Sequence, residues 1–440
     1  MNGKAAAVKR PRTLKTTYSA YYYRDEPAPD FELTAVGPGT PCGEYMRRFW
    51  QPVAFSRDLG DLPVRLRILG ENLVVFRAGS GQVGLLQLHC SHRGTSLEYG
   101  RVEAAGLRCC YHGWLYGTDG RVLETPGEPA DSTFKDRMCH GAYPTHEYNG
   151  IVFAYLGPPD RKPPFPFLDT FDLPGYRVFA GRRHTMPCNW LQIKDNAMDP
   201  IHTVFLHAAF NLQFTPSFMI MPEVEYQETP AGTIYIATRR VGDNVWVRIN
   251  DFVYPNIHQY ALEDEDGTQV KFFSRPYSTM FTVPIDDANS LNISFMRVPD
   301  TPEFDDARVQ QIVEGIGQVE RRSYEESQRD PGDFEAQSSQ RPIAIHAVEH
   351  LGATDRGITL MRKLLREEIR AVVQEGKDPS RGFFSRAAGA VIPTYSQNTV
   401  VRIPPAPTPD EDRRLLQKVG RKVAAGYYVK HPEAALPVHG

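Results

Sequence analysis

Two short segments, each with one cysteine and one histidine, carry the most specific chemical signal in this sequence. The first has the spacing C-x-H and supplies Cys90 and His92. The second has the spacing C-x-x-H and supplies Cys109 and His112, whereas Cys110 lacks this spacing. Two thiolates and two neutral imidazoles are a natural ligand set for zinc or for a mixed-ligand iron–sulfur cluster. We therefore expect a metal centre held by these four side chains.

The residues that follow the two histidines favour the iron–sulfur cluster over zinc. The first pair is followed by HRG and the second by HGW, so a glycine and bulky side chains flank each ligand. Such sequences allow two loops to close over a cluster, and imidazoles on one iron raise its reduction potential. The remaining cysteines are expected to be buried small residues rather than ligands, and they are Cys42, Cys110, Cys139 and Cys188.

A second group, with the spacing D-x-x-H-x-x-x-x-H, consists of Asp199, His202 and His207. Three residues of a regular helix advance about 300°, so Asp199 and His202 would lie near one face. Five residues advance about 500°, which would leave the two histidines roughly 140° apart. Both can reach one metal only if the helix is distorted, and Pro200 offers a cause. Two histidines and a carboxylate from elsewhere form the facial triad of mononuclear Fe(II) oxygenases.

A purely structural role remains open for the same segment. Asp199 followed by Pro200 is also a typical helix start, with the aspartate as N-cap and proline at the first helical position. A histidine pair five residues apart is more often structural than metal-binding. The two interpretations are separated by whether His202 and His207 meet a third ligand.

The elements that must position these residues follow from periodicity and turn signals. In the N-terminal half of the chain, short strands separated by turn residues predict a small antiparallel β domain. Longer strands further along the chain predict a second sheet. A proline-rich connector separates the two. We therefore expect an α+β fold. The segments are strands at 62–160 and 223–300, the connector at 157–167, and helices at 187–212, 305–327, 357–376 and 409–428.

Composition narrows the classes of function. The 440 residues are 41% hydrophobic and 23% charged, which is ordinary for a globular protein of more than one unit. The net charge of −3 gives no argument for a nucleic-acid surface. No apolar run is long enough for a bilayer, and the basic first seventeen residues lack the apolar core of a secretory signal. We therefore expect a cytoplasmic protein.

Residues 88–128 resemble the Rieske motif of ring-hydroxylating and demethylating oxygenases. The order and separation of the two motifs are similar to those of the oxygenase (alpha) subunit, especially in the phthalate dioxygenase and aromatic O-demethylase branch. The resemblance runs from about residue 38 to about 375. It implies a Rieske β domain followed by a catalytic domain with a helix-grip-like antiparallel sheet. The expected division is an N-terminal extension (1–40), the Rieske [2Fe–2S] domain (41–165), the catalytic domain (166–400) and a C-terminal arm (401–440).

The resemblance also implies site residues and cofactors. A [2Fe–2S] cluster would be held by the first four ligands, and mononuclear Fe(II) by His202, His207 and a downstream aspartate. Alignment on RPI…EHLG favours Asp333 as that aspartate, whereas alignment on EAQ favours Asp330. We prefer Asp333 because its alignment covers more residues, with Glu335 and Glu349 as weaker alternatives. In the family, the aspartate at the position of Asp199 links the cluster histidine, here His112, to an iron-ligating histidine of a neighbouring subunit.

The function implied is that of a terminal oxygenase component. It would take electrons from a separate NAD(P)H-dependent reductase or ferredoxin and use O₂ to hydroxylate or O-demethylate a carboxylated aromatic substrate, as a homotrimer. An alkylamine, betaine-like or steroid substrate is the alternative, and a Rieske electron carrier without oxygenase activity is a third hypothesis. Strand arginines that could meet a substrate carboxylate are Arg239, Arg240, Arg248 and Arg275.

Overall fold

The N-terminal part of the chain consists of short antiparallel strands. The computed structural model describes residues 13–22, 27–260, 265–274, 276–315 and 322–427. The strands are β1 (Trp50–Phe55), β2 (Val64–Ile68), β3 (Glu71–Arg77), β4 (Val83–Gln87), β5 (Arg101–Val102), β6 (Gly106–Arg108), β7 (Leu115–Gly117), β8 (Val122–Glu124), β9 (Ala142–Tyr143), β10 (Thr145–Tyr148) and β11 (Ile151–Tyr155). They form three sheets with the orders β1-β11-β10, β2-β3-β4-β9 and β5-β6-β7-β8.

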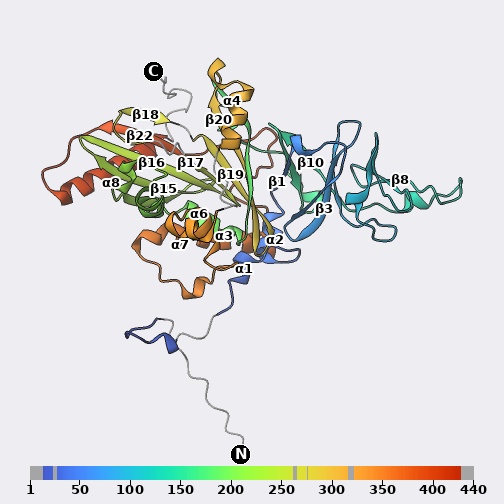
Figure 1. The fold of residues 1–440 in the computed structure, drawn as a ribbon, viewed down its shortest axis with the longest axis horizontal. Coiled ribbons are helices and arrows are strands. Elements are labelled where there is room, and N and C mark those ends of the chain that lie inside the picture. The colour runs from blue at the N-terminus through green and yellow to red at the C-terminus, as the bar shows by residue number, and fades with distance from the viewer. Residues whose placement is uncertain (1–12, 23–26, 261–264, 275, 316–321, 428–440) are drawn as a thin grey trace, which may run out of the picture.

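The β5–β8 sheet shares a hydrophobic core with strands β3 and β4. This core contains Cys90, Cys109, Trp114 and Tyr116 and is separate from the main core of the molecule. Figure 1 shows β8 at the end of the molecule farthest from the large sheet. The two Cys/His segments therefore lie in a small distal unit, away from the helices of the C-terminal part.

The proline-rich connector does not separate two independent cores. Phe165 in this connector is buried and packs on Trp50 of β1 and on Phe153 of β11. Phe153 in turn contacts Phe281 and Phe295 of the large sheet, with ring centroids 5.6 and 6.1 Å apart. A fully buried phenylalanine contributes about 1.5–3 kcal/mol relative to an exposed one. This aromatic cluster joins the N-terminal sheets firmly to the C-terminal part.

The C-terminal part is built on one large antiparallel sheet. Its strands are β13 (Tyr176–Met186), β14 (Glu223–Glu228), β15 (Gly232–Val241), β16 (Asn244–Val253), β17 (Ile257–Tyr260), β18 (Lys271–Ser274), β19 (Ser278–Asp286), β20 (Asn289–Pro299) and β22 (Gln397–Arg402). The main path runs β13-β20-β19-β17-β16-β15-β14, and β22 pairs with both β16 and β18. A short parallel pair is formed by β12 (Phe167–Leu168) and β21 (Val391–Ile392).

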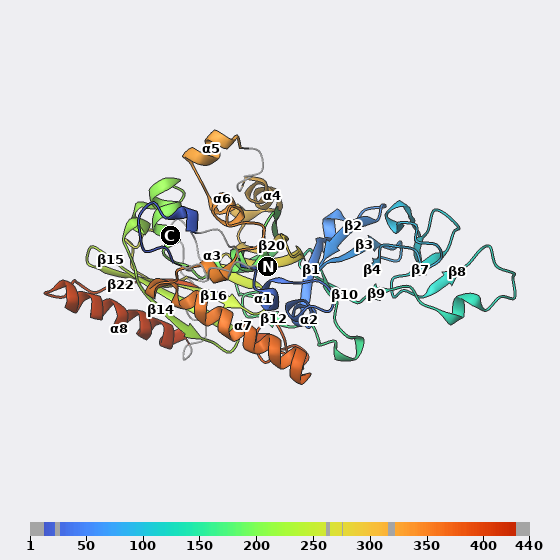
Figure 2. The same ribbon diagram turned by 90° about the horizontal axis from the view of Figure 1, so that it is seen from below.

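The two faces of this sheet have different partners, because successive side chains of a strand point to opposite faces. On β16, Val247 and Ile249 join a cluster with side chains of a C-terminal helix, α8 (Pro409–Tyr427). Arg248 and Asn250 alternate with them and line a cavity on the other face. Figure 2 shows α8 on one side of the sheet and the short helices α5 and α6 on the other.

Helices occur in the segments where periodicity predicted them, with breaks, and also in short segments outside the predicted ranges. The helices are α1 (Phe31–Thr34), α2 (Pro41–Met46), α3 (Trp190–Ala197), α4 (Asp306–Gly315), α5 (Tyr324–Arg329), α6 (Asp333–Ser338), α7 (Arg356–Glu375) and α8. Helix α7 buries residues such as Met361, Leu365 and Ile369 at a spacing of three to four, and it ends at Gly376 in the left-handed conformation. The predicted α+β fold is confirmed. Residues 409–427, which we expected in a C-terminal arm, pack against β15 and β16 as α8.

Candidate active site

Two loops with the same backbone pattern carry the four Cys/His side chains. In each loop the cysteine N–H donates to the carbonyl five residues later, and a glycine N–H four residues later donates back to the cysteine carbonyl. Both glycines have positive φ, 78° for Gly94 and 73° for Gly113, which explains why glycine occupies this turn position. The bonds are Cys90–Thr95 (2.9 Å), Gly94–Cys90 (2.8 Å), Cys109–Trp114 (2.8 Å) and Gly113–Cys109 (3.1 Å).

The side chains of these loops meet as a thiol pair and an imidazole pair. Burial raises the pKa of the Cys109 thiol, and the adjacent Cys90 thiol adds to this shift. The rings of His92 and His112 face each other with centroids 4.5 Å apart and planes at 76°. This arrangement fits a cluster in which one iron has two thiolate ligands and the other has two imidazole ligands.

Two aromatic residues support this site. The indole of Trp114 stacks on His92, with centroids 4.8 Å apart and planes at 7°, which fixes the orientation of the ring. The hydroxyl of Tyr116 lies 3.0 Å from Sγ of Cys90 and can donate a hydrogen bond to it. Hydrogen bonds to cluster sulfurs are one of the means by which a protein sets the reduction potential.

The second group depends on a break in the helix that carries it. Helix α3 ends at Ala197, and a wider π-helix, η6 (Thr203–Phe210), begins directly after His202. In a π-helix the hydrogen bonds run from i to i+5, so residues five apart return to the same side. The predicted distortion is therefore confirmed, and it brings His202 and His207 together with ring centroids 5.1 Å apart.

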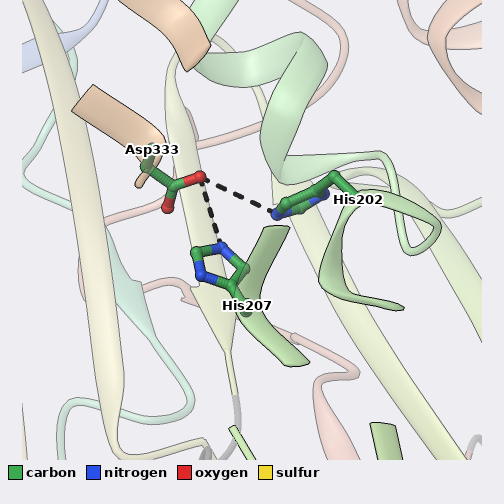
Figure 3. A group of neighbouring side chains, drawn as sticks. All are labelled: His202, His207 and Asp333. Atoms are coloured by element: carbon green, nitrogen blue, oxygen red, sulfur yellow. Dashed lines mark ion pairs between the residues drawn. The ribbon is translucent and has the colours of Figure 1, made fainter. Parts of the chain in front are cut away.

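Asp333, the first residue of α6, completes this group. Its Oδ1 lies 3.3 Å from Nε2 of His207 and 3.9 Å from Nε2 of His202 (Figure 3). Among the His, Cys, Asp and Glu side chains of the described residues, these three have ligand atoms close enough to one another to hold one metal ion. Two imidazoles and one carboxylate are the donor set of a mononuclear iron site with open positions.

The other ring nitrogens of the two histidines have partners that fix the tautomers. Nδ1 of His207 lies 2.9 Å from Oε1 of Gln213, and Nδ1 of His202 is bonded to the backbone carbonyl of Asp199. Both acceptors require the hydrogen on Nδ1, which leaves each Nε2 lone pair directed at Asp333. Burial also lowers the pKa of His202, which favours the neutral imidazole that a metal site needs.

Asn196 orients the carboxylate, and sequence reasoning missed this residue. Its side-chain amide donates to Oδ1 of Asp333 over 2.9 Å. Burial alone would raise the pKa of Asp333, but the nearby imidazoles of His207 and His202 and the hydrogen bond from Asn196 hold it well below its usual range. The signal in the sequence was weak: Asn196 lies three residues before Asp199, inside the helix predicted at 187–212, and nothing marks its partner.

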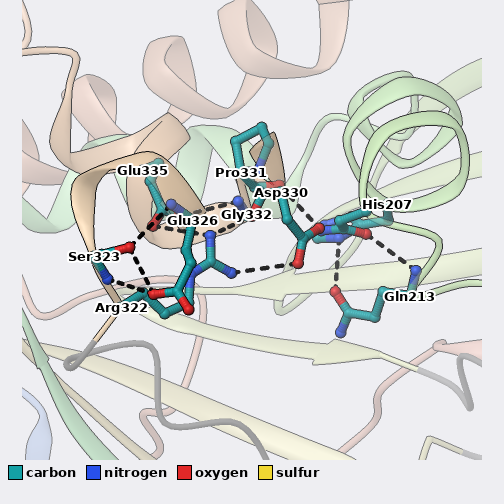
Figure 4. Close-up of polar contacts among 10 residues, drawn as sticks. His207, Gln213, Arg322, Ser323, Glu326, Asp330, Pro331, Gly332 and Glu335 are labelled. Atoms are coloured by element: carbon teal, nitrogen blue, oxygen red, sulfur yellow. Dashed lines mark hydrogen bonds and ion pairs between the residues drawn. The ribbon is translucent and has the colours of Figure 1, made fainter. Parts of the chain in front are cut away.

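Asp330, the alternative third ligand, has a different role. Figure 4 shows its side chain beside Arg322, and the carboxylate lies 3.7 Å from Nη1 of that arginine. Arg322 also donates to the backbone carbonyl of Asp330 and approaches Glu335 at 3.4 Å. Glu335 accepts from the N–H of Gly332 over 2.9 Å. These contacts hold the turn that delivers Asp333 to the two histidines.

The other candidates are accounted for in the same way. Glu349 pairs with Arg362 at 2.6 Å. Asp199 accepts from the N–H of Ile201 over 2.7 Å, and its side chain remains 27% exposed. Asp199 therefore lies at the surface beside His202 rather than inside the iron site.

A cavity of about 560 Å³ extends from this site over the large sheet. His202, His207 and Asp333 line one side of it, and strand residues Arg248 and His258 line another. Of the other candidate arginines, Arg239 packs on Phe218 and Trp246, Arg240 pairs with Asp412, and Arg275 lies outside the described residues.

Comparison with known proteins identifies the class. A model of the Rieske [2Fe–2S] domain matches residues 49–140. The oxygenase subunit of tert-butanol monooxygenase / tert-amyl alcohol desaturase from Aquincola tertiaricarbonis is 40% identical over 433 residues, which cover 93% of this chain and 91% of the relative. The alpha subunit of phenoxybenzoate dioxygenase from Ectopseudomonas oleovorans is 40% identical over 378 residues, covering 82% and 90%. The chain belongs to the Rieske non-haem iron oxygenases, as an oxygenase (alpha) subunit.

This family assignment makes the chain an O₂-dependent oxygenase subunit and not only an electron carrier. The structure of dicamba monooxygenase bound to 3,6-dichlorosalicylic acid has the same fold, with a TM-score of 0.58 and 17% identity over 76% of this chain and all of that chain. The predicted [2Fe–2S] cluster and mononuclear iron are the cofactors of this family. In the described ranges, every helix is too short or too polar to cross a bilayer.

Proposed function

We propose that this chain is the terminal oxygenase component of a system that uses electrons from a separate reductase or ferredoxin, and O₂, to hydroxylate or O-demethylate a carboxylated aromatic substrate. The observation that carries the proposal is the convergence of His202, His207 and Asp333 at the wall of a 560 Å³ cavity. A cavity of this size accommodates a one- or two-ring molecule.

The proposed roles follow the donor chemistry. Cys90, His92, Cys109 and His112 would hold the [2Fe–2S] cluster in a unit spanning 41–165, and His202, His207 and Asp333 would hold Fe(II) in a unit spanning 166–400. Residues 1–40 and 401–440 would be extensions of these units. When bound, the two groups supply single-electron transfer and O₂ reduction. The protein's part is to keep each imidazole in the tautomer that leaves Nε2 available, through Gln213 and the Asp199 carbonyl.

An anionic substrate is favoured by the charges around the cavity. Arg182, Arg248 and Arg322 line it, whereas its lining carboxylates are Asp330 and Asp333. Asp330 is paired with Arg322, and Asp333 belongs to the proposed iron site. Arg182 and Arg248 bring further positive charge to the cavity lining, which would attract a negative group and repel a cationic amine substrate. The phenoxybenzoate dioxygenase relative is named for an aromatic carboxylate.

A tertiary alcohol is the second candidate substrate. The tert-butanol monooxygenase relative is as similar in sequence as the phenoxybenzoate relative and covers more of the chain. The cavity also presents uncharged polar groups from Asn250, Tyr260 and Asn292, which can hydrogen-bond a hydroxyl. These groups could bind a neutral alcohol. Such a substrate would, however, provide no anionic group for the arginines of the cavity.

Electron transfer would take place between subunits of a homotrimer. Figure 1 shows the strands near the cluster loops at one end of the molecule, away from α3 and α6. Asp199 is partly exposed beside His202, and His112 is partly exposed on its loop. The carboxylate of Asp199 could accept a hydrogen bond from His112 of a neighbouring subunit, as in the family. Large apolar side chains are also exposed on η6 and just after it, namely Phe205 (51% exposed), Phe210 (64%) and Leu212 (75%).

Two measurements test the proposal. Iron analysis of the purified chain should give about three irons per chain, two in a cluster and one mononuclear. The chain and a reductase should then be incubated with ¹⁸O₂ and a panel of candidate substrates, and the products should be analysed for ¹⁸O. The panel consists of phenoxybenzoates, phthalates, methoxybenzoates, tert-butanol and amines. Labelled products from an aromatic acid support the proposal. Labelled products from tert-butanol alone would replace it with the second candidate. O-demethylation leaves the incorporated oxygen on formaldehyde and not on the phenol, so the absence of both labelled products and formaldehyde would contradict oxygenase activity.

A further inference from the structure

A fully buried lysine lies directly behind one wall of the cavity. Lys194 on α3 has no exposed surface, and its Nζ lies 2.7 Å from Nδ1 of His258 on β17. His258 is partly exposed and lines the cavity, whereas Lys194 does not reach it. In the described part of the chain no carboxylate forms an ion pair with Lys194. The lysine therefore acts on the cavity through the histidine.

Burial of this lysine without a bound ligand is energetically unfavourable for the folded protein. A buried positive charge without a counter-ion is strongly disfavoured, so such groups are neutralised or retained for a purpose. Burial holds the pKa of Lys194 well below its usual range. Burial and the adjacent Lys194 do the same for His258, and the negative charge of Asp333 offsets only part of this shift. Within the described residues no carboxylate forms an ion pair with Lys194, and a negatively charged ligand could supply one.

The hydrogen bond also determines which atom of His258 faces a ligand. When Lys194 carries its charge, Nζ can only donate, so Nδ1 of the imidazole is the acceptor. In that state the ring hydrogen resides on Nε2, which makes His258 a donor on its other edge. Arg248, on the neighbouring strand β16, is a second donor of the same sheet face, and its guanidinium lies over Phe218 at 5.3 Å.

We propose that His258, held in place by Lys194, binds the carboxylate of the substrate, with Arg248 as the second donor. The inference rests on the proposed function, because it takes the cavity to be the substrate site. The acidic end of the substrate would lie on β16 and β17. The rest of the molecule would extend toward His202, His207 and Asp333 on the other wall. In this arrangement Lys194 is a positioning residue, and His258 touches the substrate.

The test compares an acid with its neutral isostere. The probes are 3-phenoxybenzoate and 3-phenoxybenzamide, titrated calorimetrically into the full-length, iron-loaded protein without O₂. The wild type should bind the acid about tenfold or more tightly than the amide, since a hydrogen bond to a charged group is worth more than one to a neutral group. Lys194→Met and His258→Leu should each reduce this preference about tenfold. Affinity for the amide should change much less, whereas a general structural defect would weaken both probes.

Two further variants make the outcome specific. His258→Gln places an amide N–H near the position of Nε2, so it should recover part of the preference that His258→Leu loses. Lys363→Met removes an exposed lysine of α7, 67% exposed, and should leave the preference unchanged. If Lys194→Met does not fold, the comparison of His258→Gln with His258→Leu decides.

The inference and the proposed function fail in different ways. The inference is overturned if the wild type binds both probes equally, or if Lys194→Met and His258→Leu keep the preference for the acid. Either result can occur in a protein with three irons per chain that incorporates ¹⁸O into a neutral substrate, so oxygenase function would stand. Two irons per chain and no O₂ uptake would refute the proposed function itself.

Discussion

The side-chain amide of Asn196 donates a hydrogen bond of 2.9 Å to Oδ1 of Asp333 and so connects the end of α3 to the start of α6. These residues are 137 positions apart in the chain. The bond orients the carboxylate toward Nε2 of His207, which lies 3.3 Å from the same oxygen. A neutral donor at this position leaves the second carboxylate oxygen available.

Replacement of Asn196 should weaken the proposed iron site without dismantling it. Asn196→Ala removes the donor that fixes Asp333, and loss of such a supporting contact typically costs 10- to 100-fold in metal affinity, so we expect about tenfold. Asn196→Asp should bind Fe(II) differently again, because a second carboxylate beside Asp333 would either repel it or become a further ligand. Anaerobic Fe(II) titration of the iron-depleted protein measures both. An unchanged affinity in Asn196→Ala would contradict the orienting role.

The two candidate aspartates should respond differently to the same substitution. Asp333→Asn should reduce the iron content from about three to about two per chain, because a neutral amide is a poor iron ligand, while the visible spectrum of the cluster persists. Asp330→Asn should keep about three irons, since its carboxylate contacts Arg322 instead. Iron analysis and absorption spectra of both variants provide the measurement. Loss of iron in Asp330→Asn with retention in Asp333→Asn would reverse the assignment.

Asp199→Asn should separate metal binding from electron transfer. The backbone carbonyl of Asp199, which accepts from His202, is unaffected by this change, so both metal sites should keep their iron. The amide would no longer provide the negative acceptor proposed to face His112 of a neighbouring subunit. In single-turnover experiments with substrate and O₂, oxidation of the reduced cluster should almost stop. A normal rate would argue against the bridge.

Removal of the Tyr116 hydroxyl should lower the reduction potential of the cluster. Its hydrogen bond to Sγ of Cys90, 3.0 Å long, stabilises the more negative reduced state. Tyr116→Phe should therefore shift the potential down by a few tens of millivolts, equivalent to a several-fold change in the equilibrium constant for one electron. Redox titration followed by visible circular dichroism measures it. Tyr99→Phe, at a 71% exposed tyrosine, serves as the control and should leave the potential unchanged.

The acid stability of the β5–β8 unit should depend on Glu103. Hydrogen bonds from Arg108 and Arg101 lower the pKa of Glu103 to about 2, from an ordinary value of 4.5. Because the folded-state pKa is lowered, this contribution to stability is complete above about pH 4.5 and is lost as the pH falls toward 2. Glu103→Gln should reduce stability at pH 7 and flatten the decline on the acid side. Thermal unfolding between pH 7 and 3 tests this, and an equally steep decline in the variant would refute it.

Much of the site could be predicted because its ligands are close in sequence. Cys90 and His92, like Cys109 and His112, lie within single turns whose glycines set the backbone, so spacing alone restricts how they meet. The spacing of His202 and His207 was informative in another way. It is incompatible with a regular α-helix, and the chain resolves the conflict by forming the π-helix η6 after His202. The fold class followed from strand and helix periodicity for the same local reasons.

Long-range partners were beyond such reasoning. Asp333 and Asp330 are equivalent as local sequence, and only the packing of α6 against α3 directs one to the histidines and the other to Arg322. His258 lies in no segment with the spacing of metal ligands. Its importance appears only when α3 places Lys194 behind it.

The sequence by itself therefore determined the metal-binding chemistry of this protein, because that chemistry resides in short segments with stereochemically restricted spacing. The tertiary structure placed Asp333, the aspartate that the sequence favoured, beside the two histidines. It alone revealed the residue that orients this carboxylate and the lysine–histidine pair at the cavity wall. These contacts join residues tens to more than a hundred positions apart. Their formation depends on how helices dock on the sheet, which is governed by burial and packing over the whole core and not by local pattern.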